Sequence, residues 1–144
     1  MTPNAAKERV LEALAAAWAG LGRSLAQLAL PEIKFEPSPG VPHGIVTIRH
    51  IASDQRSQGS EGMVKIDRHY LLVVEVVEIG GRGSGVADAT AAALNAALQG
   101  KLLYGPGPTD QVIIGVGEPD EQLDNDGTWC RLRLSIPYQF EDVM

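Results

Sequence analysis

The pattern of apolar and polar positions predicts two helices. Near the N-terminus, apolar residues recur every three or four positions, which predicts a helix capped by Thr2 or Asn4. A second helix is predicted between Ser84 and Gly100, because its apolar residues form one stripe and a glycine suits its end. The two stripes are Val10, Leu14, Ala17, Trp18 and Leu21 in the first helix and Val86, Thr90, Ala93, Leu94, Ala97 and Leu98 in the second.

Segments rich in β-branched residues, or alternating between apolar and polar, predict strands. Two polar segments are predicted as connections: the Ser-, Gln- and Gly-rich loop Ser53–Gly62 and the acidic turn Glu118–Asp126. The predicted strands are Ile45–Ile51, Met63–Ile79, Gln111–Val116 and Thr128–Phe140. The expected fold is α+β, a four-stranded mainly antiparallel sheet with two helices packed on one face, in the order α-β-β-α-β-β, within a single domain of residues 1–144.

The second predicted strand is apolar on both faces. Leu71, Val73 and Val77 lie on one face, while Leu72 and Val74 are among those on the other. Two helices cover only one side of such a sheet, so the other face needs a second sheet or a neighbouring subunit. A strongly curled sheet whose hairpins fold back over the strand is the alternative. We favour assembly, because exposed apolar patches usually mark interaction sites.

The last predicted strand alternates cleanly, and its outward face carries Trp129, Arg131 and Arg133. These residue types are enriched at the energetic centres of protein interfaces, although an ordinary solvated face fits the same pattern. The acidic turn could supply partner charges across a ring of subunits. The predicted subunit interface therefore consists of Leu71, Val73, Val77, Trp129, Arg131 and Arg133.

Composition narrows the classes of partner. The net charge is −6, from 18 acidic and 12 basic residues, and no run of Lys or Arg offers a footprint for phosphate. Nucleic acid is therefore a poor candidate for a tight partner. The single cysteine, Cys130, excludes an intrachain disulfide and a multi-thiolate metal site. Neither an export signal nor a membrane span is predicted.

The sequence predicts no catalytic, cofactor or metal site. The glycine-rich segment 81–85 lacks the phosphate-binding spacing, which fails at Val86. The histidines His43, His50 and His69 do not have metal-ligand spacing. A calcium loop aligned on Gly127 would need carboxylates at Gln122 and Arg133, so a cation site is not predicted there. We therefore expect a protein that is not an enzyme and needs no cofactor.

Three stretches carry a resemblance to a known family. Ile33–Arg49 looks like an entry into a first strand, and Gly62–Val76 looks like a hairpin returning into a long strand. Asp126–Phe140 looks like a terminal strand that ends in an Ile-Pro-Tyr motif. Together they resemble the tail terminator proteins of long-tailed phages, which cap the tail tube. The loop Asp54–Ser60 and the acidic turn depart from the family's pattern.

The resemblance implies a structural virion protein made in the host cytoplasm and located at the neck end of the tail. It would form a homo-oligomeric ring, a hexamer, that binds the last ring of tail tube protein and stops polymerisation. Its opposite face would meet the head-to-tail connector or neck protein. DNA would only pass through the lumen, where negative charge lets it slide without sticking, which is a hypothesis. No membrane is involved.

Two other classes of protein stay open. Another neck component, such as a head-closure or connector protein, shares the small size, ring symmetry and mixed architecture. A small cytoplasmic enzyme of unrecognised type would need a pair of titratable groups with perturbed pKa values in a pocket. The sequence offers no such pair.

Overall fold

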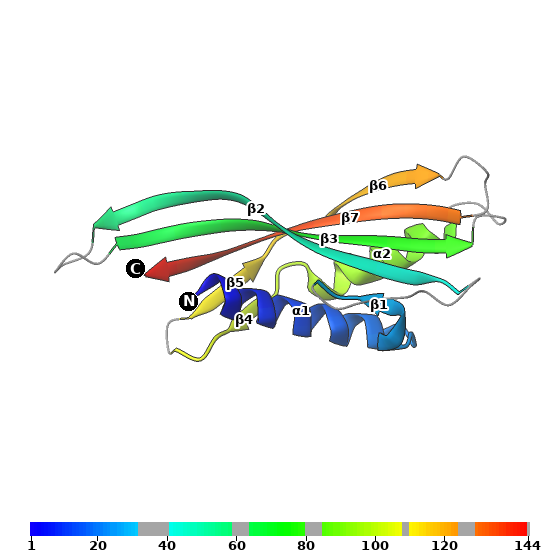
Figure 1. The fold of residues 1–144 in the computed structure, drawn as a ribbon, viewed down its shortest axis with the longest axis horizontal. Helices are drawn as coiled ribbons and strands as arrows, with labels where there is room; N and C mark the ends of the chain where they lie inside the picture. Colours follow the sequence, from blue (N-terminus) through cyan, green and yellow to red (C-terminus); the bar gives the residue numbers. More distant parts are fainter. Residues whose placement is uncertain (32–40, 59–63, 80–84, 108–109, 124–128, 144) are drawn as a thin grey trace.

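The computed structural model describes residues 1–31, 41–58, 64–79, 85–107, 110–123 and 129–143 (Figure 1). Three strands of 15 or 16 residues run along the longest axis of the molecule, and the first helix lies below them in the view of Figure 1. The elements in chain order are α1 (Pro3–Gly20), the 3-10 helix η1 (Leu25–Gln27), β1 (Leu28–Ala29), β2 (His43–Gln58), β3 (Val64–Ile79), α2 (Gly85–Leu98), β4 (Leu102–Tyr104), β5 (Gln111–Ile114), β6 (Glu118–Leu123) and β7 (Trp129–Val143).

The sheet corrects the predicted fold class. It is a seven-stranded mixed sheet in the order β1-β2-β3-β7-β5-β4, with β6 paired to β7, and it curls into a half-barrel. The four-stranded mainly antiparallel sheet was therefore wrong. β1 runs parallel to β2, with Leu28 opposite Gly44, whereas the other pairs are antiparallel. Strands as short as β1 and β4 carry too few residues to show a period in the sequence.

Two polar segments that were predicted as connections form strands instead. Residues 53–58 of the expected loop extend β2, which stays paired with β3 as far as Gln58 opposite Val64. Residues 118–123 of the expected acidic turn form β6 along β7. In both cases a long, regular partner strand supplies the hydrogen-bonding ladder, which overrides the weak β propensity of the polar residues. Residues 59–62 and 124–126 lie outside the described part of the chain.

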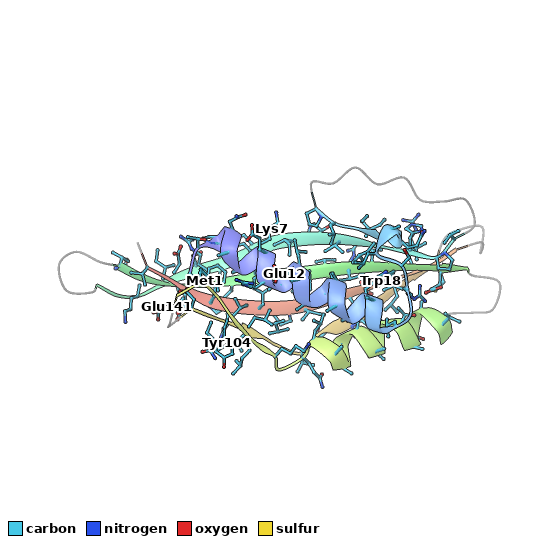
Figure 2. All side chains as sticks on the ribbon, turned by 90° about the horizontal axis from the view of Figure 1, so that it is seen from below. Met1, Lys7, Glu12, Trp18, Tyr104 and Glu141 are labelled. Carbon is cyan, nitrogen blue, oxygen red and sulfur yellow. The ribbon has the colours of Figure 1, made fainter. Side chains whose placement is uncertain are left out.

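Both helices cover one face of the sheet and bury most of each predicted stripe, but Leu21 and Val86, which the spacing also placed in the stripes, are exposed. α1 begins after Thr2, whose Oγ1 accepts a hydrogen bond from the Ala5 amide at 3.2 Å. Figure 2 shows α1 lying across the sheet, with Trp18 near its end. Ser84, where the second helix was predicted to begin, lies outside the described residues. The buried helix residues are Ala6, Val10, Leu14 and Trp18 in α1 and Ala87, Thr90, Ala91, Leu94 and Leu98 in α2.

β5 and β6 pair with the same edge of β7, one at each end, with a break between them. Pro137 lies at that break, where it has no amide hydrogen to offer, and its carbonyl accepts from the Gly115 amide at 2.8 Å. Asn95 of α2 holds the next turn: its Oδ1 accepts from the Gly117 amide at 2.9 Å, and its Nδ2 donates to the Gly117 carbonyl at 3.2 Å. The start of β6 is therefore fixed by a helix below the sheet.

Candidate functional site

The candidate site is the face of the sheet that no described helix covers, called here the outer face. Side chains alternate along a strand, so residues whose neighbours enter the helix-covered core point the other way. The strand register brings Thr47, Val73 and Ser135 level with one another on this face. In its central part, the outer face carries Ile45, Thr47 and Arg49 of β2, Leu71, Val73, Glu75 and Val77 of β3, and Arg131, Arg133, Ser135 and Pro137 of β7.

Five of the six predicted interface residues share the outer face. Val77 stands opposite Arg131, and the pair Glu75 and Arg133 comes next along the same strands. Val73 and Val77 are 9% and 1% exposed, so the chain already buries them. Leu71, Arg131 and Arg133 are half-buried. The backbone of Trp129 pairs with Ile79, and its side chain lies outside the described part of the structure. Whether these residues contact another subunit stays a prediction.

One half of the outer face is polar and strongly charged. Arg131 Nη1 lies 3.0 Å from Glu75 Oε1, on partly exposed side chains for which such a pair stabilises little. A hollow of about 150 Å³ beside this pair is lined by Ile45, Thr47, Arg49, Val73, Glu75 and Arg133. Three arginines therefore share this half with one glutamate from the same three strands.

Acidic side chains follow the far border of this half. Glu118 and Asp120 of β6 are exposed and stand opposite Ser135 and Arg133 of β7. Because opposite residues of an antiparallel pair share a face, both carboxylates lie on the outer face. The outer face thus has Arg49 on its β2 side and two carboxylates on its β6 side.

The other half of the outer face is apolar and hollow. A β-bulge between His50 and Ala52 interrupts the pairing of β2, and Ile51 within it is 58% exposed. Ile113 of β5 is 42% exposed, and His69 Nε2 lies 3.6 Å from Asp54 Oδ2 on the same part of the face. The hollow has a volume of about 650 Å³ and is lined by Ile51, Ala52, Asp54, His69, Tyr70, Leu71, Ile113, Gly115, Pro137, Tyr138 and Gln139.

Sequence reasoning missed several of these residues. Ile51 and Ile113 were assigned to strands without a face, and Glu118 and Asp120 were assigned to a turn. The every-second-residue placement of Glu118 and Asp120 was the one local signal that they could share a strand face. For Ile51 there was no such signal, because a bulge shifts the alternation.

The side chains of Tyr138 and Cys130 are buried in the core and are not presented on the outer face. Tyr138 reaches the opposite, helix-covered side, where its ring stacks on Tyr70 with centroids 5.6 Å apart. Burial, with a smaller contribution from Tyr70, raises the pKa of the Tyr138 hydroxyl well above its ordinary value. Cys130 is fully buried. Among the described residues, no three His, Cys, Asp or Glu side chains are grouped so that they could hold a metal ion.

The outer face presents apolar side chains around a hollow, and it presents charged side chains with Arg49 on the β2 side and two carboxylates on the β6 side. Such a surface suits contact with another macromolecule. Within the described ranges, neither helix is long and apolar enough to cross a membrane.

Comparison with known proteins gives a fold over almost the whole chain. No protein-family model and no curated protein matches the sequence. One solved chain, which carries no functional description, is similar with a TM-score of 0.71 and 19% identity, covering 97% of this chain and 96% of that chain. Another belongs to the virion of a native gene transfer agent particle, with a TM-score of 0.59, 17% identity and 96% of each chain covered. At these identities the likeness shows that the fold is shared.

Proposed function

We propose that this chain is a structural virion protein of a phage-type particle, and that within the particle it is a tail terminator. In this role it forms a hexameric ring on the last ring of tail tube protein, stops the tube from growing and offers its other side to the neck. It acts without catalysis or cofactor. DNA passes through the ring without binding tightly.

The observation that carries the proposal is the fold shared with a chain of the gene transfer agent virion over 96% of both chains. The likeness spans nearly the whole chain, which supports a structural role for its single domain. Three stretches resemble tail terminators and support the narrower role: Ile33–Arg49, Gly62–Val76 and Asp126–Phe140. Their described parts belong to or adjoin the neighbouring strands β2, β3 and β7 of one sheet.

The outer face supports assembly in a second way. Its apolar hollow and its charged side chains on the β2 and β6 sides are the features that a subunit uses to find and orient a partner. The predicted interface residues Leu71, Arg131 and Arg133 remain in this proposal as half-buried members of the face. Val73 and Val77 act through packing beneath it, because their side chains are already buried.

A neck component other than the terminator, such as a head-closure or connector protein, is the second candidate. The same likeness favours it, since both roles belong to a virion and the shared fold does not separate them. The two candidates differ in one property. A terminator limits the length of a growing tube, whereas a connector does not.

Tube length therefore tests the proposal. Tail tube protein from the same particle is polymerised with and without the purified chain, and tube lengths are measured by negative-stain electron microscopy. We expect short, capped tubes of narrow length distribution when the chain is present and long, uncapped tubes when it is absent. An equal amount of a heat-unfolded sample of the same chain is the control. Tubes of uncontrolled length in both samples would exclude the terminator role.

A further inference from the structure

Strand β2 has an open stretch on its outer edge. β3 occupies one edge of β2 along its length, while on the other edge β1 covers Gly44 and Ile45 alone. The bulge at His50–Ala52 then twists the strand, a device that blocks edge-to-edge pairing. Between β1 and the bulge, residues 46–50 form a regular edge without a described partner strand.

Strand β6 is open on the opposite side of the sheet. It pairs with β7 through Glu118–Leu123, and no described strand pairs with its other edge. At about 3.4 Å per residue, the open stretch of β2 and the length of β6 are similar, near 17–20 Å. Besides the short edge strands β1 and β4, the described sheet therefore carries two open stretches of matching length.

The directions of these strands suit a head-to-tail contact. β2 is antiparallel to β3, β3 to β7, and β7 to β6, so β6 runs opposite to β2 across four strands. When copies are related by rotation about an axis inclined to the strands, as strands are in a barrel, β6 of one copy meets β2 of the next in antiparallel orientation. The inclination is needed because Asp120 lies level with Ile45 of its own chain, and it shifts β6 along β2 toward the open stretch 46–50. That is the more stable of the two pairings, and repeating it closes a ring.

The charges on the two edges are complementary. The sequence of β6 contains three carboxylates and no base, and the stretch 46–50 of β2 contains Arg49 and no acid. Arg49, Glu118 and Asp120 are exposed and share the outer face. In a continuous sheet, Arg49 of one copy would lie across the strand pair from the carboxylates of its neighbour. Two β6 edges, by contrast, would repel each other.

We propose that the partner of the open β2 edge is β6 of a second copy of this chain, so that neighbouring subunits share one continuous antiparallel sheet. The inference rests on the proposed ring, and it names the contact that builds it. Arg49 on one side and Glu118 and Asp120 on the other orient the two edges.

Charge reversal tests the orientation of this contact. Arg49→Glu, and separately the double variant Glu118→Arg/Asp120→Arg, should each raise the subunit concentration needed to cap half the tubes about tenfold. Mixing the two variants in equal amounts should recover most of the capping, because each can then pair with the other. Lys101→Glu and Asp88→Arg are matched controls at exposed positions away from both edges. Reversals that cap as well as the wild type, or a mixture that fails to recover, would overturn the contact.

Disulfide trapping tests the contact without relying on tube capping. Thr47 is exposed on the open edge and shares the outer face with Glu118 and Asp120. The double variants Thr47→Cys/Glu118→Cys and Thr47→Cys/Asp120→Cys are oxidised at high concentration, alone and on tubes. A ladder longer than a dimer in at least one of them is expected on non-reducing gels, while each single variant stays monomeric. No ladder in either double variant, or dimers of Thr47→Cys alone, would overturn the proposal.

A failure of the terminator role can be distinguished from a failure of the strand contact. If wild-type chain does not limit tube length but a double-cysteine variant gives the ladder, the terminator role fails and the strand contact stands. If the wild type limits tube length but reversals and ladders are negative, the role stands and the strand contact fails.

Discussion

Trp18 is the residue that ties the start of the chain to the sheet. Its indole Nε1 donates to the Ser24 carbonyl at 3.0 Å, and the guanidinium of Arg23 lies 5.2 Å from its ring centre. Arg23 in turn pairs with the buried carboxylate of Glu78 and bonds Thr90 Oγ1 at 3.1 Å. A side chain at Gly44 would meet the indole at 3.1 Å, so the sheet approaches the helix closely only because this position is a glycine.

Tyr138 gives a prediction for alkaline pH. Its folded pKa is raised, so the neutral hydroxyl stabilises the fold below about pH 10 and this contribution is lost as the pH rises above that value. In a titration of tyrosinate absorbance, one component should appear only when the protein unfolds. Tyr138→Phe should remove that component and leave the fold more resistant to alkali.

The matched control is Tyr104→Phe, at a tyrosine that is 68% exposed. It should leave the delayed component in place. A delayed component that survives in Tyr138→Phe would contradict the assignment. Circular dichroism at neutral pH checks that both variants are folded.

At the scale of elements, Asn95 links α2 to the break between β5 and β6. Its side chain satisfies both the amide and the carbonyl of the buried Gly117. Asn95→Ala leaves both groups unpaired and should lower the free energy of unfolding by about 2–4 kcal/mol, measured by denaturant titration. Gln99→Ala, which removes an exposed amide side chain, should change it by less than about 0.5 kcal/mol. Equal losses in the two variants would show that the bridge contributes nothing.

At the scale of the whole molecule, the net charge of −6 opposes binding to nucleic acid. We expect no measurable mobility shift of duplex DNA at low or at physiological salt. A protein that binds DNA through phosphate contacts releases counterions, so its affinity falls steeply as the salt concentration rises. That salt dependence would identify a DNA-binding site. The double variant Glu118→Arg/Asp120→Arg reverses two charges and serves as a comparison. Tight, salt-sensitive binding by the wild type would contradict passive passage of DNA through a ring.

The shape of the whole molecule follows from the sheet. The open stretches of β2 and β6 leave hydrogen-bonding groups that a single chain does not satisfy among its described strands. A closed assembly removes such edges. The proposed ring is an arrangement that would pair the open stretches of β2 and β6.

The sequence by itself determined the elements whose causes are local. Helical spacing and the Thr2 cap predict α1, and the stripe through Val10, Leu14 and Trp18 is buried as its spacing requires. The alternation in β7 correctly separates Leu132 and Leu134, which are buried, from Arg131 and Arg133, which lie on the outer face. Each of these features depends on residues within one or two turns of each other, or on a period of two.

The tertiary structure decided the features that depend on distant partners. Residues 53–58 and 118–123 are polar, and they become strands because β3 and β7 offer them ladders. Val77 looked like a surface residue for a partner, yet packing within the chain leaves it 1% exposed. Ile51 and Ile113 line the same hollow although they lie 62 positions apart in the sequence. Their proximity depends on the strand register and on the curvature of the sheet, neither of which can be read from a linear sequence.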